Sequence, residues 1–349
     1  MARPDIRLVS PEPEPAAREA DVERSLRPER FDQFVGQRRV VQNLTTWIAA
    51  ARAQRRTLDH VLLTGPPGLG KTTLANLIAG EMGGKLVVSS GPTLERVGDL
   101  AGVLTKLRKG EVLFIDEIHR IKKHVAEFLY SAMEDFRIEL AVDEGPYARA
   151  VSMNLHRFTL IGATTRAGLL TKPFRDRMGI QERLEPYGTD DLGEIVRRSS
   201  TLLGVGIDGP AIELIAVRAR GTPRLANRYL ARVRDVAQAR GERRVTRTLA
   251  EEGLDMLGVD REGLDAVDRR LLQILAETPG QPVGLKTLAV ALGEEEDTIE
   301  DVYEPYLIVR GFVRKTARGR VLGPRGFELL GIEPPAAAPA GAAQGALFS

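Results

Sequence analysis

The segment that most constrains this chain is GPPGLGKT at residues 65–72, which fits the pattern G-x-x-x-x-G-K-[ST]. The apolar run VLLT comes directly before it, and the helix-forming stretch TTLANLIAGEM begins within it. Strand, glycine-rich loop and helix in this order cradle phosphate groups, because backbone N–H groups and the helix N-terminus attract anions. An ordinary glycine-rich loop is the alternative. The pattern predicts an α/β domain with a phosphate site at one edge of its sheet.

The loop pattern also predicts a role for each of its residues. Gly65, Gly68 and Gly70 let the backbone close on phosphate oxygens. Lys71 would reach the β- and γ-phosphates of a nucleotide, and the hydroxyl of Thr72 would ligate Mg²⁺. We therefore expect a nucleotide and Mg²⁺ as cofactors, and the resemblance described below implies that the nucleotide is ATP.

A second motif is EVLFIDEIH at residues 111–119, where a buried strand ends in Asp116 and Glu117. Successive strand residues point in opposite directions, so one carboxylate can hold Mg²⁺ while the other polarises water. The alternative is an acidic pair that caps the next helix. The same letters mimic the DExH box of two-lobed helicases, which the single P-loop pattern disfavours. His119 and His124 have poor spacing for zinc, and we interpret them as packed or solvated.

Polar residues at three further places are candidates for catalysis. The strand Phe158–Gly162 is followed by ATTR, and Thr164 at its tip could position the attacking water, although simple turn chemistry is the alternative. Arg177 in PFRDR and Arg224 in RGTPR could stabilise charge on a transferred phosphate, within the subunit or from a neighbour. Taken singly, both would be ordinary surface arginines.

The hydrophobic pattern divides the chain into three folded parts between two ends that cannot bury much. The first part alternates strands with helices and predicts a parallel sheet with helices on both faces. Its predicted strands are His60–Thr64, Lys85–Ser89, Glu111–Ile115 and Phe158–Gly162, and its predicted helices include Thr72–Met82 and Lys123–Glu134. From about Asp190 to Leu257 we predict only helices. A winged-helix outline follows, with helices Asp265–Glu277, Leu285–Leu292 and Asp297–Leu307 and strands Gly311–Lys315 and Arg320–Leu322.

Composition narrows the class of protein. The 349 residues include 50 Lys and Arg against 48 Asp and Glu, a formal net charge of +2 that excludes a uniformly basic coat. The absence of cysteine excludes disulfides and thiolate metal sites. No apolar run approaches 18 residues and the N-terminus lacks a secretory h-region, so we expect no membrane span and a cytoplasmic location.

Taken together, the motifs resemble those of the AAA+ ATPases, and most closely the RuvB family of Holliday junction branch migration motors. The segments that carry the resemblance are GPPGLGKTT, LFIDEIHR, TLIGATTRAG, PFRDR, RGTPRLANR, SLRPERFDQFVGQ, DTIEDVYEPYLIVRGF and TARGR, which span about residues 23–323. The resemblance implies an α/β P-loop NTPase domain with a parallel sheet, a small all-helical lid and a winged-helix head. The expected boundaries are a disordered leader 1–22, ATPase domain 23–186, lid 187–259, head 260–332 and flexible tail 333–349.

The resemblance also implies roles for individual residues. Asp116 and Glu117 match the Walker B pair, with Asp116 as the metal ligand beside Thr72. Thr164 matches sensor 1, Arg177 the arginine finger supplied to the adjacent subunit's ATP, and Arg224 the sensor 2 arginine. Further nucleotide contacts are implied at Leu26, Arg27, Thr73, Glu134, Asp135, Phe136 and Tyr187. A finger that acts on a neighbour requires an oligomer, and the family forms hexameric rings around duplex DNA.

Residues 137–154 are expected to form a β-hairpin, which in the family docks on the junction-binding partner RuvA; an edge hairpin without a partner is the alternative. The chain departs from the family pattern at three places. Asp143 and Glu144 occupy the hairpin turn where Gly and Lys are expected, Met178 replaces Phe, and Lys315 replaces Arg. A RuvC-type resolvase is expected in the same complex.

The charges of the head are sharply divided along the sequence. Residues 294–304 carry seven acids and no base, and residues 310–325 carry six bases and no acid. Phosphates would repel the acidic third helix, so we expect the wing to contact DNA; a solvated basic turn is the alternative. The predicted contacts are Arg314, Lys315, Arg318 and Arg320.

Two hypotheses for function follow. The first is an ATP-driven motor that moves duplex DNA to drive branch migration in recombination, DNA repair and the SOS response. The second is a clamp-loader-like or adaptor AAA+ module that uses ATP to assemble partners without moving DNA.

Overall fold

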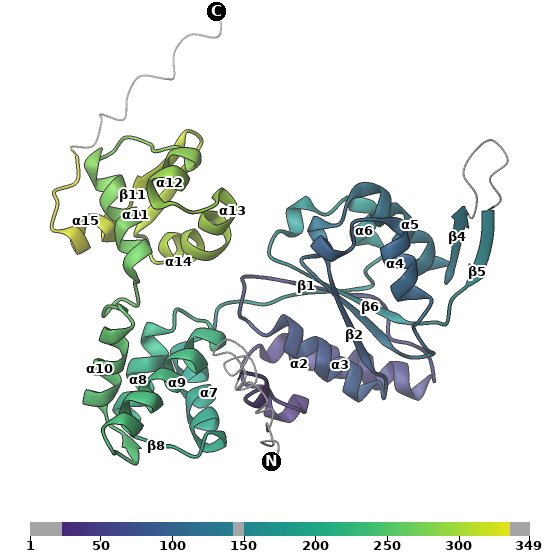
Figure 1. Cartoon of the computed structure of the whole chain (residues 1–349), viewed down its shortest axis with the longest axis horizontal. Helices are drawn as coiled ribbons and strands as arrows, with labels where there is room; N and C mark the ends of the chain where they lie inside the picture. The colour runs from purple at the N-terminus through teal and green to yellow at the C-terminus, as the bar shows by residue number, and fades with distance from the viewer. Residues whose placement is uncertain (1–22, 142–149, 336–349) are drawn as a thin grey trace, which may run out of the picture. The chain divides into compact units, whose positions relative to one another are not determined.

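The computed structural model describes residues 23–141 and 150–335, and the chain divides between Gly253 and Leu254 into two compact units (Figure 1). The predicted leader 1–22, the hairpin turn at 143–147 and residues 336–349 of the predicted tail lie outside the described residues. Within the described residues, none of the helices combines the length and hydrophobicity needed to cross a bilayer.

A five-stranded parallel sheet organises the first unit. Its order is β2-β3-β6-β1-β7, with neighbouring strands parallel throughout. The strands are β1 (Val61–Thr64), β2 (Leu86–Ser90), β3 (Val112–Asp116), β6 (Thr159–Thr164) and β7 (Ile180–Arg183). The four predicted strands are confirmed to within two residues at each end. The edge strand β7 was not predicted, because its four residues alternate between buried and exposed too briefly to give a clear period.

Helices cover both faces of this sheet, as the predicted α/β architecture requires (Figure 1). The helices α2 (Arg38–Ala53) and α3 (Lys71–Glu81) lie on one face. The other face carries α4 (Val97–Leu104), α5 (Lys123–Glu134) and α6 (Lys172–Asp176). Strands β1 and β3 are buried along nearly their whole length, which explains why their sequences are continuous apolar runs.

Short elements connect these layers and form the expected hairpin. The described residues include four 3₁₀ turns, η1 (Phe31–Gln33), η2 (Gly91–Thr93), η3 (Ile118–Arg120) and η4 (Ala167–Leu169). The antiparallel strands β4 (Arg137–Ala141) and β5 (Ala150–Asn154) pair outside the main sheet, which confirms a hairpin at 137–154. On β5, Val151 and Met153 share one face and are 45% and 40% exposed.

The region after the sheet is mainly helical, with α7 (Thr189–Leu202), α8 (Gly209–Arg218), α9 (Pro223–Ala239) and α10 (Arg247–Met256). The prediction that it contains only helices was wrong. Strands β8 (Gly206–Ile207) and β9 (Arg244–Val245) form a two-residue parallel ladder. Two residues are too few to establish a period of 2, so the hydrophobic pattern could not indicate this ladder.

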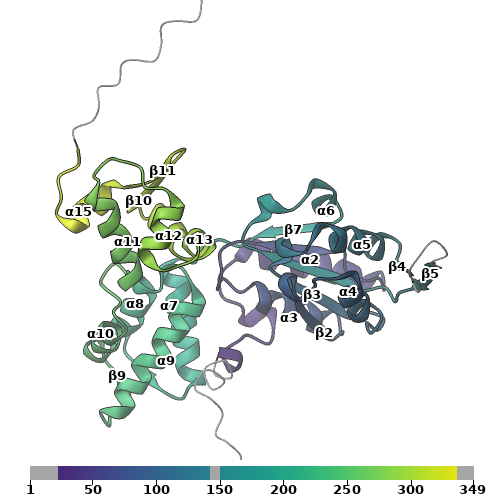
Figure 2. The ribbon, with the colours of Figure 1, turned by 45° about the horizontal axis from the view of Figure 1, so that its top comes forward.

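The second unit has the predicted order of helices and hairpin (Figure 2). Its helices α11 (Ala266–Glu277) and α12 (Leu285–Leu292) match the predicted ranges closely. The antiparallel strands β10 (Val313–Thr316) and β11 (Gly319–Leu322) form the wing, and α15 (Pro324–Leu330) follows. An apolar core with Leu271, Leu307 and Phe312 joins these elements.

The predicted third helix of this unit is not a continuous α-helix. It consists of α13 (Glu296–Thr298), the π-helical turn η5 (Ile299–Tyr303) and α14 (Glu304–Val309). Pro305 stands in the first turn of α14 and has no N–H to donate to the carbonyl four residues earlier, at Asp301. The π-helical turn η5, which is wider than an α-helical turn, contains Asp301, whose carbonyl lacks this hydrogen bond.

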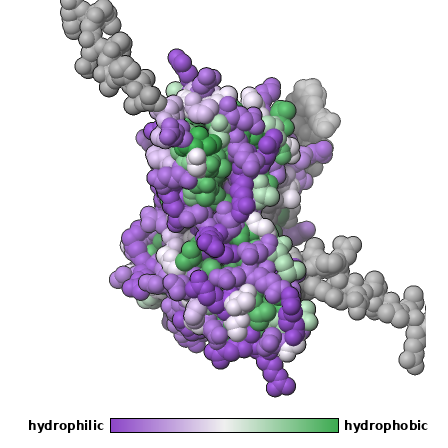
Figure 3. Space-filling model, turned by 90° about the vertical axis from the view of Figure 1, so that its left-hand side faces the viewer, coloured by the Kyte–Doolittle hydropathy of each residue, from purple (hydrophilic) through white to green (hydrophobic). Residues whose placement is uncertain are grey.

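The surface in Figure 3 is mostly hydrophilic, with small separate hydrophobic areas. The exposed apolar side chains include those of Met256, Val290 and Val309. Single exposed apolar residues of this kind are ordinary in globular proteins.

Candidate active site

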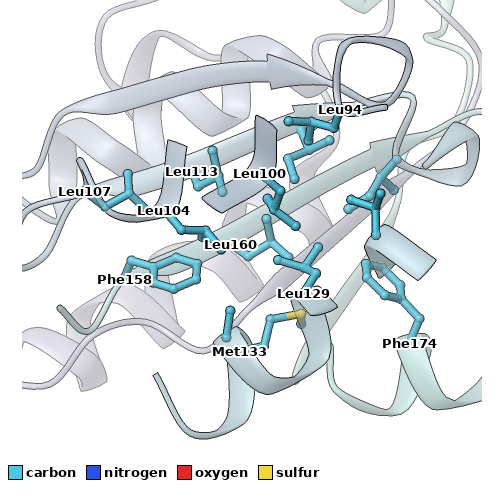
Figure 4. Packing of buried hydrophobic residues seen from close by; sticks show 14 of the residues in the cluster. Leu94, Leu100, Leu104, Leu107, Leu113, Leu129, Met133, Phe158, Leu160 and Phe174 are labelled. Atoms are coloured by element: carbon cyan, nitrogen blue, oxygen red, sulfur yellow. The ribbon is translucent and has the colours of Figure 1, made fainter. Parts of the chain in front are cut away.

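The packing beneath the sheet fixes the elements that carry the candidate residues. Leu113 of β3 and Leu160 of β6 contribute to one buried cluster, together with side chains of α4, α5 and α6 (Figure 4). Leu129 and Met133 enter it from α5, and Phe174 enters it from α6. The cluster therefore fixes α5 and α6 against β3, which leads into the acidic pair, and β6, which ends at Thr164.

The predicted phosphate loop lies between β1 and α3, as its pattern requires. Gly65, Gly68 and Gly70 have φ values of +136°, +77° and +102°, which side chains rarely adopt. A Cβ at Gly65 would lie 2.5 Å from the Leu184 carbonyl oxygen. The three glycines are thus needed both for conformation and for space.

Lys71 is the first residue of α3 and is only 7% exposed. Its ammonium donates to the carbonyl oxygens of Gly65 (2.7 Å) and Pro66 (2.8 Å). The lysine is therefore folded along the inside of the loop. Thr72 and Thr73 occupy the same first helical turn, at the positive end of the helix dipole.

The helical region contacts the loop directly. A Cβ at Gly68 would lie 2.7 Å from Thr222 Cγ2 and 3.2 Å from Arg224 Cβ, so the start of α9 packs against the loop. The hydroxyl of Tyr187 donates to the Leu69 carbonyl oxygen (3.3 Å), and burial raises the pKa of Tyr187. The predicted nucleotide contacts Tyr187 and Arg224 are thus brought to the loop.

Leu26 and Arg27 lie in the first described segment. Leu26 is buried, and its carbonyl oxygen accepts a hydrogen bond from Arg198 (2.8 Å). The carboxylate of Glu23 lies 3.9 Å from Arg27 and 3.5 Å from Arg224. This shared contact joins Arg27 to the start of α9.

Asp116 ends β3 and Glu117 directly follows the strand, and the two carboxylates have different environments. The backbone N–H of Glu117 donates to Asp116 Oδ1 (3.0 Å), but burial is the larger influence and raises the pKa of Asp116. The hydrogen bond with His119 lowers the pKa of Glu117. Glu117 itself has φ of +47°, a conformation that side chains seldom adopt. The two adjacent acids are thus suited to different tasks.

Thr164 ends β6 between β1 and β3, which confirms the predicted placement between loop and acidic pair. It is fully buried, and its carbonyl oxygen accepts a hydrogen bond from the Gly65 N–H (3.2 Å). Its Oγ1 accepts from the Arg166 N–H (2.9 Å) and lies 2.8 Å from His119 Nδ1. The same nitrogen lies 3.1 Å from Glu117 Oε2.

His119 is the residue of this site that reasoning from the sequence missed. Its interpretation as a packed or solvated histidine accounts for its burial, but not for its position between two candidate catalytic groups. The available signal was its place in DEIH, two residues after Glu117.

A second group of predicted residues lies apart from the loop. Arg177 Nε and Nη2 each lie 3.1 Å from an oxygen of Glu134, and Nη1 donates to the Pro173 carbonyl oxygen (2.8 Å). The guanidinium also stacks 4.7 Å from the centre of the Tyr130 ring. Helices α5 and α6 together hold this arginine.

Strand direction explains why this group does not join the loop. The loop follows the carboxyl end of β1, whereas Arg177 precedes the amino end of β7, and the two strands are parallel. Phe136 packs against Phe158, which precedes the amino end of β6. Asp135 caps the adjacent end of α5. The predicted nucleotide contacts Glu134, Asp135 and Phe136 thus lie at the edge of the sheet opposite the loop of their own chain.

The wing differs from the prediction in how its charges are used. Arg320 is 6% exposed and donates to two carboxylates, Glu304 (3.1 Å from Nη2) and Glu300 (2.7 Å). Lys315 also donates to Glu300 (2.8 Å) and lowers the pKa of that carboxyl group. The acidic helix and basic wing, which seemed separate in sequence, are therefore joined by ion pairs. Because its guanidinium is buried against carboxylates, we infer a structural role for Arg320 in place of the predicted DNA contact.

The other wing arginines remain on the surface. Arg314 and Arg318 are exposed, and the described residues offer no carboxylate within ion-pair distance of either side chain. Lys315 is 52% exposed despite its contact with Glu300. Arg310 and Arg325 both bind Glu262 (2.9 and 2.7 Å). The exposed positive charges of the wing thus lie on strand β10, at Arg314 and Lys315, and on the turn, at Arg318.

Three family models match the chain in succession. Residues 26–184 match the Holliday junction DNA helicase RuvB P-loop domain, 187–260 the RuvB AAA lid domain and 261–331 the RuvB C-terminal winged helix domain. A RuvB of Pelodictyon phaeoclathratiforme is 55% identical over 308 residues, covering 88% of this chain and 90% of the relative. The chain belongs to the RuvB family. It is therefore an AAA+ P-loop ATPase with a lid and a winged-helix domain.

Other RuvB proteins agree over similar lengths. The "Holliday junction branch migration complex subunit RuvB" of Myxococcus xanthus is 53% identical over 315 residues, covering 90% of this chain and 92% of the relative. The solved structure "Thermotoga maritima RuvB Holliday junction branch migration motor" is similar with a TM-score of 0.81 and 45% identity, covering 89% of this chain and all of the other. The resemblance inferred from the motifs is confirmed.

Proposed function

We propose that this RuvB-family ATPase is the motor subunit that moves duplex DNA to drive branch migration of Holliday junctions in recombination and repair, in the bacterial cytoplasm. The observation that carries the proposal is the gathering of loop, acidic pair and Thr164 at the carboxyl ends of β1, β3 and β6, in a chain whose three parts all match RuvB models. The proposed ATPase domain is 23–186, the lid 187–259 and the head 260–332.

The chain's own residues can divide the work of ATP hydrolysis. Backbone N–H groups of the loop and the start of α3 bind the phosphates, and Lys71 exchanges its carbonyl partners for phosphate oxygens. Glu117, whose carboxylate stays ionised, orients and activates water, and Thr164 holds the water or the γ-phosphate. Tyr187 and Arg224 let the lid follow the state of the nucleotide.

The residues present fit a magnesium ion beside the nucleotide. Mg²⁺ prefers oxygen ligands, and Thr72 offers a hydroxyl and Asp116 a carboxylate. Burial of Asp116 without a cation raises its pKa, and a bound cation would offset that cost. Within the described residues no cluster of His, Asp and Glu forms a complete metal cage, as expected where phosphates supply the other ligands. Bound there, Mg²⁺ would neutralise charge that develops on the transferred phosphate.

Arg177 is proposed to act on the ATP of a neighbouring subunit in a homo-hexameric ring. Its place at the amino edge of the sheet supports action in trans, because the loop of its own chain follows the opposite edge. Glu134, Asp135 and Phe136 would meet the neighbour's nucleotide from the same side.

DNA and protein partners are proposed for two other surfaces. The exposed wing residues Arg314, Lys315 and Arg318 would bind DNA phosphates without reading sequence, which suits a motor that must move along any duplex. The exposed apolar pair Val151 and Met153 on the hairpin would dock on a RuvA-type junction-binding protein. A RuvC-type resolvase would act on the same complex.

The test is movement of a synthetic four-way junction by the purified protein with a RuvA-type partner and ATP. We expect strand exchange with the unmodified chain and none with Lys71→Ala, whereas Glu117→Gln should bind ATP without hydrolysing it. ATP hydrolysis without any change in junction mobility would refute the motor and favour the assembly ATPase.

Mixing two inactive proteins tests the finger. The Arg177→Ala protein lacks the finger and the Glu117→Gln protein lacks the water-activating carboxylate, so we expect neither to hydrolyse ATP alone. In a mixed ring, some interfaces would place the intact pocket of an Arg177→Ala subunit beside the intact Arg177 of a Glu117→Gln subunit. Partial recovery of ATPase activity is expected on mixing, and complete absence of recovery would contradict action in trans.

A further inference from the structure

His119 lies at the meeting point of two groups to which the proposed function assigns separate tasks. Its side chain is 8% exposed and its Nδ1 lies 2.8 Å from Thr164 Oγ1 and 3.1 Å from Glu117 Oε2. One imidazole nitrogen is therefore within hydrogen-bond range of both the proposed water-activating carboxylate and the proposed sensor hydroxyl.

The surroundings of His119 hold it in this place. It belongs to η3, whose Ile118 is buried against Gly162 of β6; a Cβ at Gly162 would lie 2.8 Å from Ile118 Cδ1. The left-handed conformation of Glu117 turns the chain into η3. A strained, closely packed turn of this kind costs free energy and suggests a functional reason for the arrangement.

Hydrogen-bond chemistry selects the form of the ring. A carboxylate accepts only, so its closeness to Nδ1 favours the tautomer with hydrogen on Nδ1. With that proton, Nδ1 donates to Glu117 or Thr164, and Thr164 Oγ1 already accepts from the Arg166 N–H. The hydroxyl proton of Thr164 is then free to point at a phosphate oxygen or water. Without the Nδ1 proton, the hydroxyl would instead donate to the ring.

The loop itself is connected to this arrangement. The Thr164 carbonyl oxygen accepts from the Gly65 N–H, and Thr164 pairs with Thr64 in the sheet. A continuous path of contacts therefore runs from the phosphate loop through Thr164 and His119 to Glu117.

We propose that His119 is a positioning residue that joins the Thr164 hydroxyl and the Glu117 carboxylate into one hydrogen-bonded unit, so that engagement of Thr164 by the γ-phosphate sets the orientation of Glu117 toward water. The proposal rests on the proposed function. It adds a residue that touches neither phosphate nor water and acts through two that do.

The experiment compares His119→Ala, His119→Asn and His119→Leu with the control His124→Ala, in which an exposed histidine of α5 is removed. Steady-state ATP hydrolysis by the full chain gives kcat and KM for each variant. We expect His119→Ala and His119→Leu to lower kcat by about 10- to 100-fold, by analogy with the range found for groups that orient metal-ligating residues, with KM within about twofold. Asn offers an N–H near the Nδ1 position and should recover most of kcat, and His124→Ala should match the unmodified protein.

A double-mutant cycle separates this role from a merely structural one. If the residues act as a unit, Thr164→Val combined with His119→Ala should cost no more than the worse single change. Binding of a non-hydrolysable ATP analogue checks that each variant is folded. Variants of His119 with unchanged kcat, equal losses in the Asn and Leu variants, or fully additive losses would each overturn the proposal.

The controls distinguish this inference from the proposed function. If the unmodified protein hydrolyses ATP and moves junctions while His119→Ala does the same, only the role of His119 fails. If the unmodified protein hydrolyses no ATP, the proposed function itself fails. Should His119→Ala not fold, the comparison of His119→Asn with His119→Leu still decides the outcome.

Discussion

The ion pairs beneath the wing predict that Arg320 stabilises the head and does not bind DNA. The change we choose is Arg320→Met in the full chain, which keeps an unbranched apolar stem of similar course and removes the charge. Arg320 and Glu304 are 6% and 2% exposed, and Arg320 makes both hydrogen bonds that the structure gives to the Glu304 carboxylate. Glu300 keeps Lys315 as a partner. The loss therefore falls mainly on Glu304.

The magnitude follows from that burial. Removing one partner of a buried ion pair typically costs about 3–5 kcal/mol, because the remaining charge stays out of water. We expect about 3 kcal/mol, the lower end of that range. For a unit of roughly 100 residues this corresponds to a fall in melting temperature of about 12–24 °C.

Hydrogen exchange of peptides from α14 and β11 measures this loss within the full chain. The matched control is Arg318→Met on the exposed turn, which should change stability by less than about 0.5 kcal/mol. Replacing both partners, with Arg320→Met and Glu304→Met, should restore most of the protection, because no unpaired charge remains.

Duplex binding measured over a range of salt concentrations completes the test. Arg318→Met should reduce the salt dependence of log K by about 0.9, the value for one phosphate contact, and Arg320→Met should leave it unchanged while the head is folded. Reduced salt dependence in Arg320→Met together with unchanged hydrogen exchange would refute the reasoning and return Arg320 to the DNA surface.

Three further predictions concern the first unit. Burial lowers the pKa of His60, whose Nδ1 accepts a hydrogen bond from the Leu160 N–H. The contribution of this histidine to the free energy of unfolding is therefore fully present above the unfolded pKa of about 6.5 and falls as pH drops below that value. Thermal melting from pH 8 to pH 5 should show this decline, and the decline should be smaller in His60→Gln. Gly162→Ala should displace Ile118 and lower the free energy of unfolding, measured in urea, by about 1–3 kcal/mol. It should also lower kcat, which a separate assay of ATP hydrolysis would measure. Glu134→Gln should lower kcat roughly 10- to 100-fold without raising KM, because the finger loses its ion pair; equal activity would show that Glu134 does not hold it.

The sequence predicted those parts of the site that depend on neighbouring residues. The loop glycines, Lys71 and the acidic pair follow from local patterns of strand, turn and helix, and each lies where its pattern requires. Thr164 was placed correctly between the loop and the acidic pair, because it comes at the end of a largely apolar strand that was predicted to be central in the sheet. The short ladder of β8 and β9 and the edge strand β7 were missed because too few residues carry their periodicity.

Contacts between distant residues account for the remaining differences. A run of acids and a run of bases do not reveal which side chains face each other, so the burial of Arg320 against Glu304, sixteen residues away, could not be read from charge alone. His119 was assigned no role because its partner Thr164, at the end of β6, is 45 residues away in the sequence. In both cases the decisive information is which faces the fold brings together.

Helix α5 has a consequence for how a ring of these subunits would operate. It begins at Lys123, two intervening residues after the end of η3, and ends at Glu134, which forms an ion pair with Arg177. Twelve residues of helix span about 18 Å, so a single regular element covers the distance between these two ends. In the proposed hexamer, the same helix would therefore connect one subunit's own ATP site to the arginine proposed to act on its neighbour's ATP.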